Sequence, residues 1–162
     1  MTKTYRQGAV GALLDEYERA IDELKDIISG LDHGDYTAIV DRKTKDMNCV
    51  SIQSILNHVT RAGYGYANYI RKQFGDEWIE RKENYELFTP DIACRELDRM
   101  LQYTSETLAN KTQLSFEEMI NAVIATEWGQ KFDFEQMLEH AIVHVLRHRR
   151  QIEKFKLTIQ EM

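Results

Sequence analysis

Residues 133–159 read DFEQMLEHAIVHVLRHRRQIEKFKLTI, and this segment has the pattern of one long amphipathic helix. Its apolar residues recur every three or four positions with charged residues between them, as on a helix that buries one face. The apolar stripe consists of Phe134, Met137, Leu138, Ala141, Val145 and Ile152. We expect this helix to start near Asp133 and to run to about Ile159.

Three earlier segments share this helical pattern, namely residues 5–28, 51–75 and 89–108. Ser51 and Thr89 are suitable N-caps, and Pro90 fits the first helical position. Gly30 follows the first segment and Gly75 ends the second, as glycine often does at a helix end. Together with the last helix, these segments predict an all-α fold, a four-helix bundle with one or two long crossover connections.

The segments between these helices are less regular. Residues 31–50 show no clear periodicity, and a connection of this length in a bundle is a candidate wall or lid for a site. A linker containing Trp78 joins the second and third helices. Residues 115–125 are compatible with either a helix or a strand, and residues 125–129 are expected to form a turn.

Composition limits the class of protein further. The 162 residues suit a single domain over 1–162, and one proline and eight glycines favour long helices. The net charge of −6 argues against nucleic acid as the main partner. Cys49 and Cys94 form no metal or disulfide motif, and we find neither a signal peptide nor a run of about 18 apolar residues. We therefore expect a soluble cytoplasmic protein without a membrane partner.

Three histidines stand four residues apart in the last helix: His140, His144 and His148. Counted from Phe134, they lie about 120°, 80° and 40° from the centre of the apolar stripe, so His148 is expected nearest the core. Imidazoles four residues apart can share a metal ion, whereas His140 and His148 stand about 12 Å apart along the axis. A single site would therefore combine His144 with one of its two neighbours.

A third ligand would have to come from another helix. His58 lies on the shoulder of the apolar stripe of residues 51–75, and facing helices of a bundle can bring such side chains together. The alternatives remain open at this point, because His58 also fits a structural histidine and the row of three fits a polar helix surface. The sequence lacks the HExxH motif of zinc proteases, and His33 is expected at the surface.

Several of these features together resemble the DinB/YfiT-like superfamily. They are His58 in the second helix, the Trp128–Gly129 turn, and a final helix with His144, His148 and Gln151 in the order HxxxHRxQ. The resemblance covers nearly the whole chain and implies a four-helix bundle in which His58, His144 and His148 hold a divalent metal. Arg150 stands where many members have glycine, which does not affect the proposed ligands.

Residues around this implied site have two interpretations each. His140 and Gln151 are candidates for the pocket edge or for hydrogen bonds to a ligand, and equally for structural roles. Aromatic residues that could line a pocket, or belong to the core, are Tyr64, Tyr66, Tyr69, Trp78 and Trp128. Cys49 precedes a helix N-terminus, where a thiolate can be stabilised, although an incidental thiol is the simpler interpretation. The basic residues of the last helix, expected on a solvated face, are Arg147, Arg149, Arg150, Lys154 and Lys156.

The resemblance also implies a class of chemistry. Characterised members of the superfamily include thiol-dependent S-transferases and a mycothiol-dependent maleylpyruvate isomerase. The expected function is therefore a metal-dependent enzyme that activates a low-molecular-weight thiol to attack an electrophilic small molecule. A metal-dependent hydrolase that uses water is the near alternative, and a non-catalytic metal-binding or stress-response protein is the alternative from another class. Imidazole ligands leave zinc, nickel and iron open, and a homodimer is expected from the resemblance.

Overall fold

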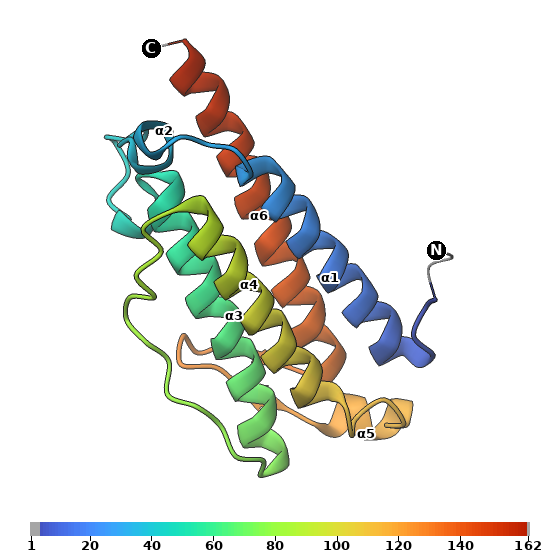
Figure 1. The fold of residues 1–162 in the computed structure, drawn as a ribbon. Helices are drawn as coiled ribbons and strands as arrows, with labels where there is room; N and C mark the ends of the chain where they lie inside the picture. The colour runs from blue at the N-terminus through green and yellow to red at the C-terminus, as the bar shows by residue number, and fades with distance from the viewer. Residues whose placement is uncertain (1–3, 162) are drawn as a thin grey trace.

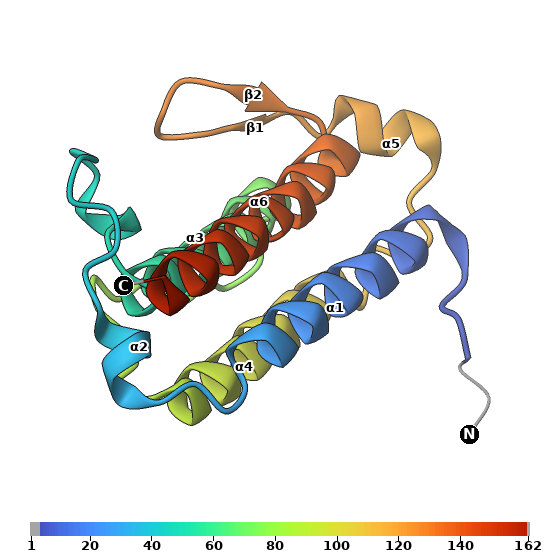
Figure 2. The same cartoon turned by 90° about the horizontal axis from the view of Figure 1, so that it is seen from above.

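The computed structural model describes residues 4–161 and confirms the all-α four-helix bundle (Figure 1). Its long helices are α1 (Gly8–Ile28), α3 (Ile52–Phe74), α4 (Pro90–Leu108) and α6 (Phe134–Gln160). Helix α1 packs against α4 and α6, and α3 packs against the same two helices. Figure 2 shows the result as two layers, with α1 over α4 and α6 over α3.

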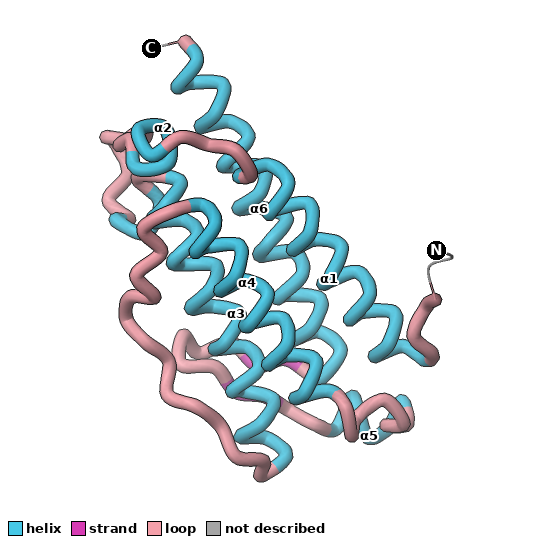
Figure 3. Tube along the Cα trace, in the orientation of Figure 1, coloured by secondary structure: helices cyan, strands magenta, loops and turns pink. Residues whose placement is uncertain are grey.

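Two long connections join the first three of these helices. Helices α1 and α6 run in one direction and α3 and α4 in the other, so the chain must return along the bundle between α3 and α4 (Figure 1). Residues 75–89 make this return as an extended crossover along the outside of α3 (Figure 3). The connection between α1 and α3 contains the short helix α2 (His33–Thr37) and the 3-10 turn η1 (Met47–Cys49).

The helix ends lie close to the positions expected from the sequence. Ser51 and Asp133 each form a capping box, and the Thr89 hydroxyl accepts a hydrogen bond from the backbone N–H of Ile92. Gly75 ends α3 in the left-handed conformation, at φ +73°. The expected start of the first helix at residue 5 was wrong by three residues, because the backbone N–H of Arg6 turns back to the Asp15 carboxylate.

The ambiguous segment 115–125 divides into two elements. Helix α5 (Phe116–Asn121) ends before β1 (Ile124–Ala125), which pairs antiparallel with β2 (Lys131–Phe132). The expected turn at residues 125–129 is the tip of this hairpin, where Gly129 adopts φ +87°. No helix among residues 4–161 is long and apolar enough to cross a membrane.

Helix α4 packs closely against α3 at Gly63. A Cβ atom at this position would meet Met100 Sδ and lie 2.9 Å from Met100 Cγ. We therefore expect Gly63→Ala to lower the free energy of unfolding by about 1 kcal/mol or more, since overpacking a core costs about 1–3 kcal/mol and outweighs the better helix propensity of alanine. Urea denaturation measures this change.

A Met100→Ala background supplies the control for this prediction. Shortening Met100 removes the atoms that the new Cβ would meet, so Gly63→Ala should be less destabilising there than in the wild type. Equal or greater stability of the Gly63→Ala single variant would contradict the close packing of α3 on α4.

Candidate metal centre

Three histidines from two helices meet inside the bundle. His58 comes from α3, and His144 and His148 come from consecutive turns of α6. One ring nitrogen of each lies within 4.8 Å of the others, which positions the three to bind one metal ion. His58 Nε2 and His144 Nε2 are 3.0 Å apart, and the ring centroids of His144 and His148 are 4.5 Å apart. We refer to these three residues as the histidine cluster.

The donor set fits a divalent transition metal. Two imidazole nitrogens that bind one tetrahedral zinc ion at about 2.0–2.1 Å stand about 3.3 Å apart, close to the spacing between His58 and His144. Facing lone pairs at 3.0 Å need either a proton or a cation between them. Three protein ligands are also the number found at catalytic zinc sites, which keep a coordination position open.

The histidine cluster is held in the neutral state that metal binding requires. The pKa of His144 is lowered to about 2, mainly by burial, and the nearby His148 and His58 contribute to this shift. Burial is also the main cause of the lowered pKa values of His58 and His148, while the carboxylate of Asp46 opposes both shifts. Neutral imidazole is the form that offers a lone pair to a metal.

Gln151 orients one member of the histidine cluster. Its Oε1 lies 3.0 Å from His148 Nδ1 and accepts a hydrogen bond when that nitrogen carries the proton. The bond places the proton on Nδ1 and leaves the Nε2 lone pair of His148 for a metal. Outer hydrogen-bond partners of this kind fix the tautomer and ring orientation of metal-binding histidines.

We expect Gln151→Leu to weaken zinc binding by about 10- to 100-fold, since this is the typical effect of removing a residue that hydrogen-bonds to a metal-binding histidine. A competition titration against a chromogenic chelator measures the affinity. Gln160→Leu, at an exposed position near the end of the same helix, should bind zinc like the wild type. An unchanged affinity in Gln151→Leu would show that the His148 ring needs no support from Gln151.

The order of burial within the row of histidines differs from the expectation. His144 is the most buried, with 6% of its surface exposed, whereas His148 is half-buried. The angular prediction that His148 lies nearest the core was therefore wrong. It considered α6 alone, whereas Tyr66 of α3 covers His144, with its ring centroid 5.7 Å away and nearly perpendicular. His33 is exposed, as expected.

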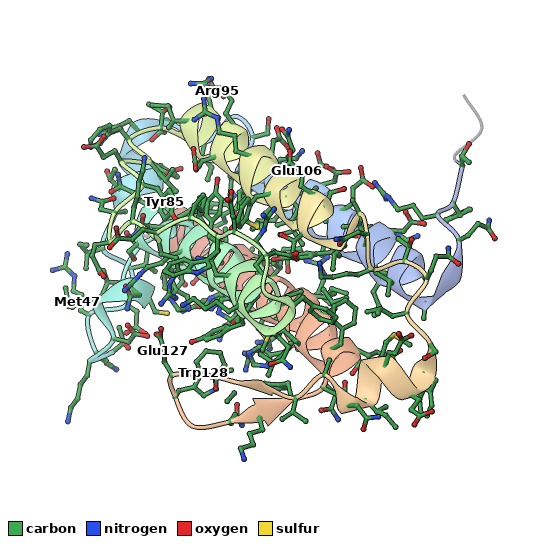
Figure 4. The ribbon with its side chains drawn as sticks, turned by 90° about the horizontal axis from the view of Figure 1, so that it is seen from below. Met47, Tyr85, Arg95, Glu106, Glu127 and Trp128 are labelled. Carbon is green, nitrogen blue, oxygen red and sulfur yellow. The ribbon has the colours of Figure 1, made fainter. Side chains whose placement is uncertain are left out.

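His140 lies beside the histidine cluster in an aromatic surround. Its ring is 5.3 Å from Tyr66, 6.0 Å from Trp128 and 5.0 Å from Phe132, measured between centroids. The hairpin supplies Trp128 at its tip, and the backbone N–H of the adjacent Glu127 donates to the hydroxyl of Tyr69. Figure 4 shows both hairpin residues reaching toward α3. We call Tyr66, Trp128 and His140 the aromatic wall.

A cavity of about 340 Å³ opens beside His58 and the aromatic wall. His58 lines it together with all three wall residues and two arginines, Arg61 and Arg81. Sequence analysis missed these two arginines. Arg61 follows His58 by one helical turn, which is a signal that could have found it, whereas the crossover brings Arg81 to the cavity without any local signal.

Two other aromatic residues and a cysteine singled out in the sequence lie outside this cavity. Trp78 lines a second cavity of about 220 Å³. Tyr64 instead stacks on Tyr85 with centroids 5.2 Å apart and donates a hydrogen bond to Glu96. Burial and the negative charge of Asp46 raise the pKa of Cys49, so this thiol is not activated as a thiolate.

The basic residues of α6 are only partly a solvated face. Arg149 forms an ion pair with Glu23 of α1, and Lys156 Nζ donates to the backbone carbonyl of Ile27. Both contacts tie α6 to α1. Arg147 is exposed, and its charge contributes to the lowered pKa values of His140 and His144.

The fold and the site together define a helical bundle whose facing helices position three histidines to bind a metal ion. A family model confirms the resemblance seen in the sequence, matching residues 1–154 under the description DinB family. The chain therefore belongs to the DinB family. Searches of the curated proteins and of the solved structures gave no match.

Proposed function

We propose that this chain binds one divalent metal ion through His58, His144 and His148 and acts as a metal-dependent enzyme on a small molecule. The observation that carries the proposal is the pairing of the histidine cluster with an open cavity of about 340 Å³ that His58 itself lines. A purely structural metal site is closed by four protein ligands, whereas a catalytic one leaves a position for water or substrate.

The chain's own residues would prepare this site in two ways. Gln151 holds the His148 ring with its free nitrogen toward the other two histidines. The aromatic wall covers His144 and one side of the cavity, which would exclude water from a bound substrate. A bound divalent ion would supply Lewis-acid chemistry, lowering the pKa of a thiol or water molecule that it coordinates.

We infer that the nucleophile is a low-molecular-weight thiol that attacks an electrophilic carbon. In such a transfer the sulfur forms a bond to carbon, the leaving group departs with the bonding electron pair, and the thiol proton passes to solvent. Among the described residues, those that line the cavity include no cysteine or serine. Cys49 lies outside this lining, and its raised pKa favours the protonated thiol. This supports an external thiol, with water as the nucleophile in the hydrolase alternative.

A thiol-transfer assay tests the proposed function. Zinc-, nickel- or iron-loaded protein is mixed with cysteine methyl ester and 1-chloro-2,4-dinitrobenzene, and thioether formation is followed by absorbance. We expect acceleration above the uncatalysed rate with at least one metal, and loss of that acceleration in His144→Ala. Hydrolysis of p-nitrophenyl acetate without thiol would instead favour the hydrolase. Metal binding without either activity would favour the non-catalytic alternative.

A homodimer and a cytoplasmic location remain predictions of the proposal. Exposed apolar side chains on and next to α5 offer a surface on which two copies could pair, namely those of Phe116, Ile120 and Val123. Light scattering coupled to size-exclusion chromatography would report a mass of about twice 19.1 kDa if the protein is a dimer.

A further inference from the structure

Two adjoining cavities lie on the outer side of α3, next to the histidine cluster. The larger, of about 340 Å³, includes His58 and the aromatic wall, and the smaller, of about 220 Å³, includes Trp78. They are parts of one hollow, because Arg61, Gly65 and Arg81 line both. The hollow therefore runs from His58 to the crossover at residues 75–89.

The crossover is fixed to α3, which places Arg81 in this hollow. Asn68 Nδ2 donates to the carbonyl of Ile79 at 2.7 Å, and Arg61 Nη2 pairs with Glu83 at 2.8 Å. Gly65 leaves the room that the guanidinium needs, since a Cβ atom there would lie 2.8 Å from Arg81 Nη1. Arg61 and Arg81 thus face the same cavity from two different segments of the chain.

The carboxylates of the protein that pair with the two arginines are largely exposed to solvent. The carboxylates paired with Arg61 and Arg81 belong to Glu83 and Glu127, whose side chains are 85% and 67% exposed. Exposed ion pairs of this kind contribute little, so a ligand carboxylate sheltered in the cavity can replace them.

The aromatic wall adds the second recognition element. Trp128 and His140 lie nearly parallel, at 28° between ring planes, and Tyr66 meets both edge-on. Such a wall accommodates the flat apolar body of a small molecule, while a pair of guanidinium groups binds the two oxygens of a carboxylate.

We propose that Arg61 and Arg81 bind the carboxylate of a small planar acid, with the body of that acid against the aromatic wall and beside His58. This inference rests on the proposed function, because it names the class of substrate that the enzyme would take. Arg61 and Arg81 are then the residues that determine specificity for acids over neutral compounds of the same shape.

The test compares three probes of one shape: benzoate, neutral benzamide and cationic benzamidine. Binding is measured by isothermal titration and by tryptophan fluorescence, since the only two tryptophans of the sequence, Trp78 and Trp128, line the hollow. Each titration is done with metal-free and zinc-loaded protein. The variants are Arg61→Gln and Arg81→Gln, with Arg19→Gln on α1, an arginine paired with Glu16 and outside the hollow, as the matched control.

We expect benzoate to bind at least about tenfold more tightly than benzamide. Arg61→Gln and Arg81→Gln should each lower the affinity for benzoate by about 10-fold or more, because a hydrogen bond to a charged group typically contributes this much. Arg19→Gln should bind like the wild type. Arg81→Lys keeps the charge without the two-pronged geometry, so it should bind benzoate with intermediate affinity. Circular dichroism and the urea midpoint establish that each variant is folded.

Three results would overturn the inference: equal binding of benzoate and benzamide, tighter binding of benzamidine, or benzoate binding that needs zinc but neither arginine. The last would mean that the acid binds at the metal. Failure of the proposed function is a separate outcome, because benzoate binding to the arginines is measured on metal-free protein. If the protein takes up no metal but binds benzoate through the two arginines, the proposed acid-binding site stands and the proposed metal-dependent enzyme does not.

Discussion

Replacing His144 with alanine is expected to abolish stoichiometric metal binding. His144 is the central member of the histidine cluster, 3.0 Å from His58 Nε2 and adjacent to His148 on α6. Removing it leaves only His58 and His148, whose ring centroids are 5.0 Å apart, and two imidazoles hold a metal ion less tightly than three. We expect the affinity for zinc to fall by more than about 100-fold. Removing only a residue that hydrogen-bonds to a metal-binding histidine already lowers metal affinity by about 10- to 100-fold. Competition against a chelator of known affinity measures the change.

His140→Ala is the matched control for this variant. His140 belongs to the same helix and the same row, one turn earlier, but it is part of the aromatic wall and is not a member of the histidine cluster. Its replacement should leave zinc affinity within a few-fold of the wild type. Equal losses in His140→Ala and His144→Ala would contradict the assignment of the cluster, as would wild-type affinity in His144→Ala.

Phe134→Ala is expected to produce the largest loss of stability. Phe134 is fully buried at the start of α6 and packs edge-on against Phe74 at the end of α3, with centroids 5.7 Å apart. Truncating a buried phenylalanine leaves a cavity and costs about 3–5 kcal/mol. That is a large fraction of the about 5–15 kcal/mol that stabilises a typical domain, so the urea midpoint should fall sharply.

Phe88→Ala is the control that removes an aromatic ring from an exposed position. Phe88 lies in the crossover just before α4 and is 56% exposed, so its replacement should change the free energy of unfolding by no more than about 0.5 kcal/mol. Similar losses in the two variants would mean that the α3–α6 end of the core is not packed as the structure has it.

The long helices were predictable because their signals are local. Ser51, Thr89 and Asp133 each cap a helix where the sequence placed a capping side chain before an apolar stripe. Residues 115–125 were not predictable, since a short apolar run fits a helix or a strand equally. Their division depends on the turn at Gly129, which pairs Ile124 with Phe132.

The site was predictable only in part, for a related reason. Helical spacing places His144 and His148 on one side of α6, and the resemblance added His58 from another helix. The burial of His144 depends on Tyr66 of α3, which no pattern within α6 reveals. Arg81 reaches the cavity through the crossover, whose position is set by contacts such as Asn68 with Ile79. Tertiary contacts of this kind are absent from local sequence patterns.

The most direct test of the metal centre is the number of metal ions bound per chain. Untagged wild-type protein is reconstituted separately with zinc, nickel and ferrous iron, freed of excess metal, and analysed for metal and protein. We expect about one ion per chain with at least one of these metals, because the three clustered nitrogens form a single site. No retained metal under any of these conditions would contradict the assignment and leave the histidine cluster as a structural feature of the bundle.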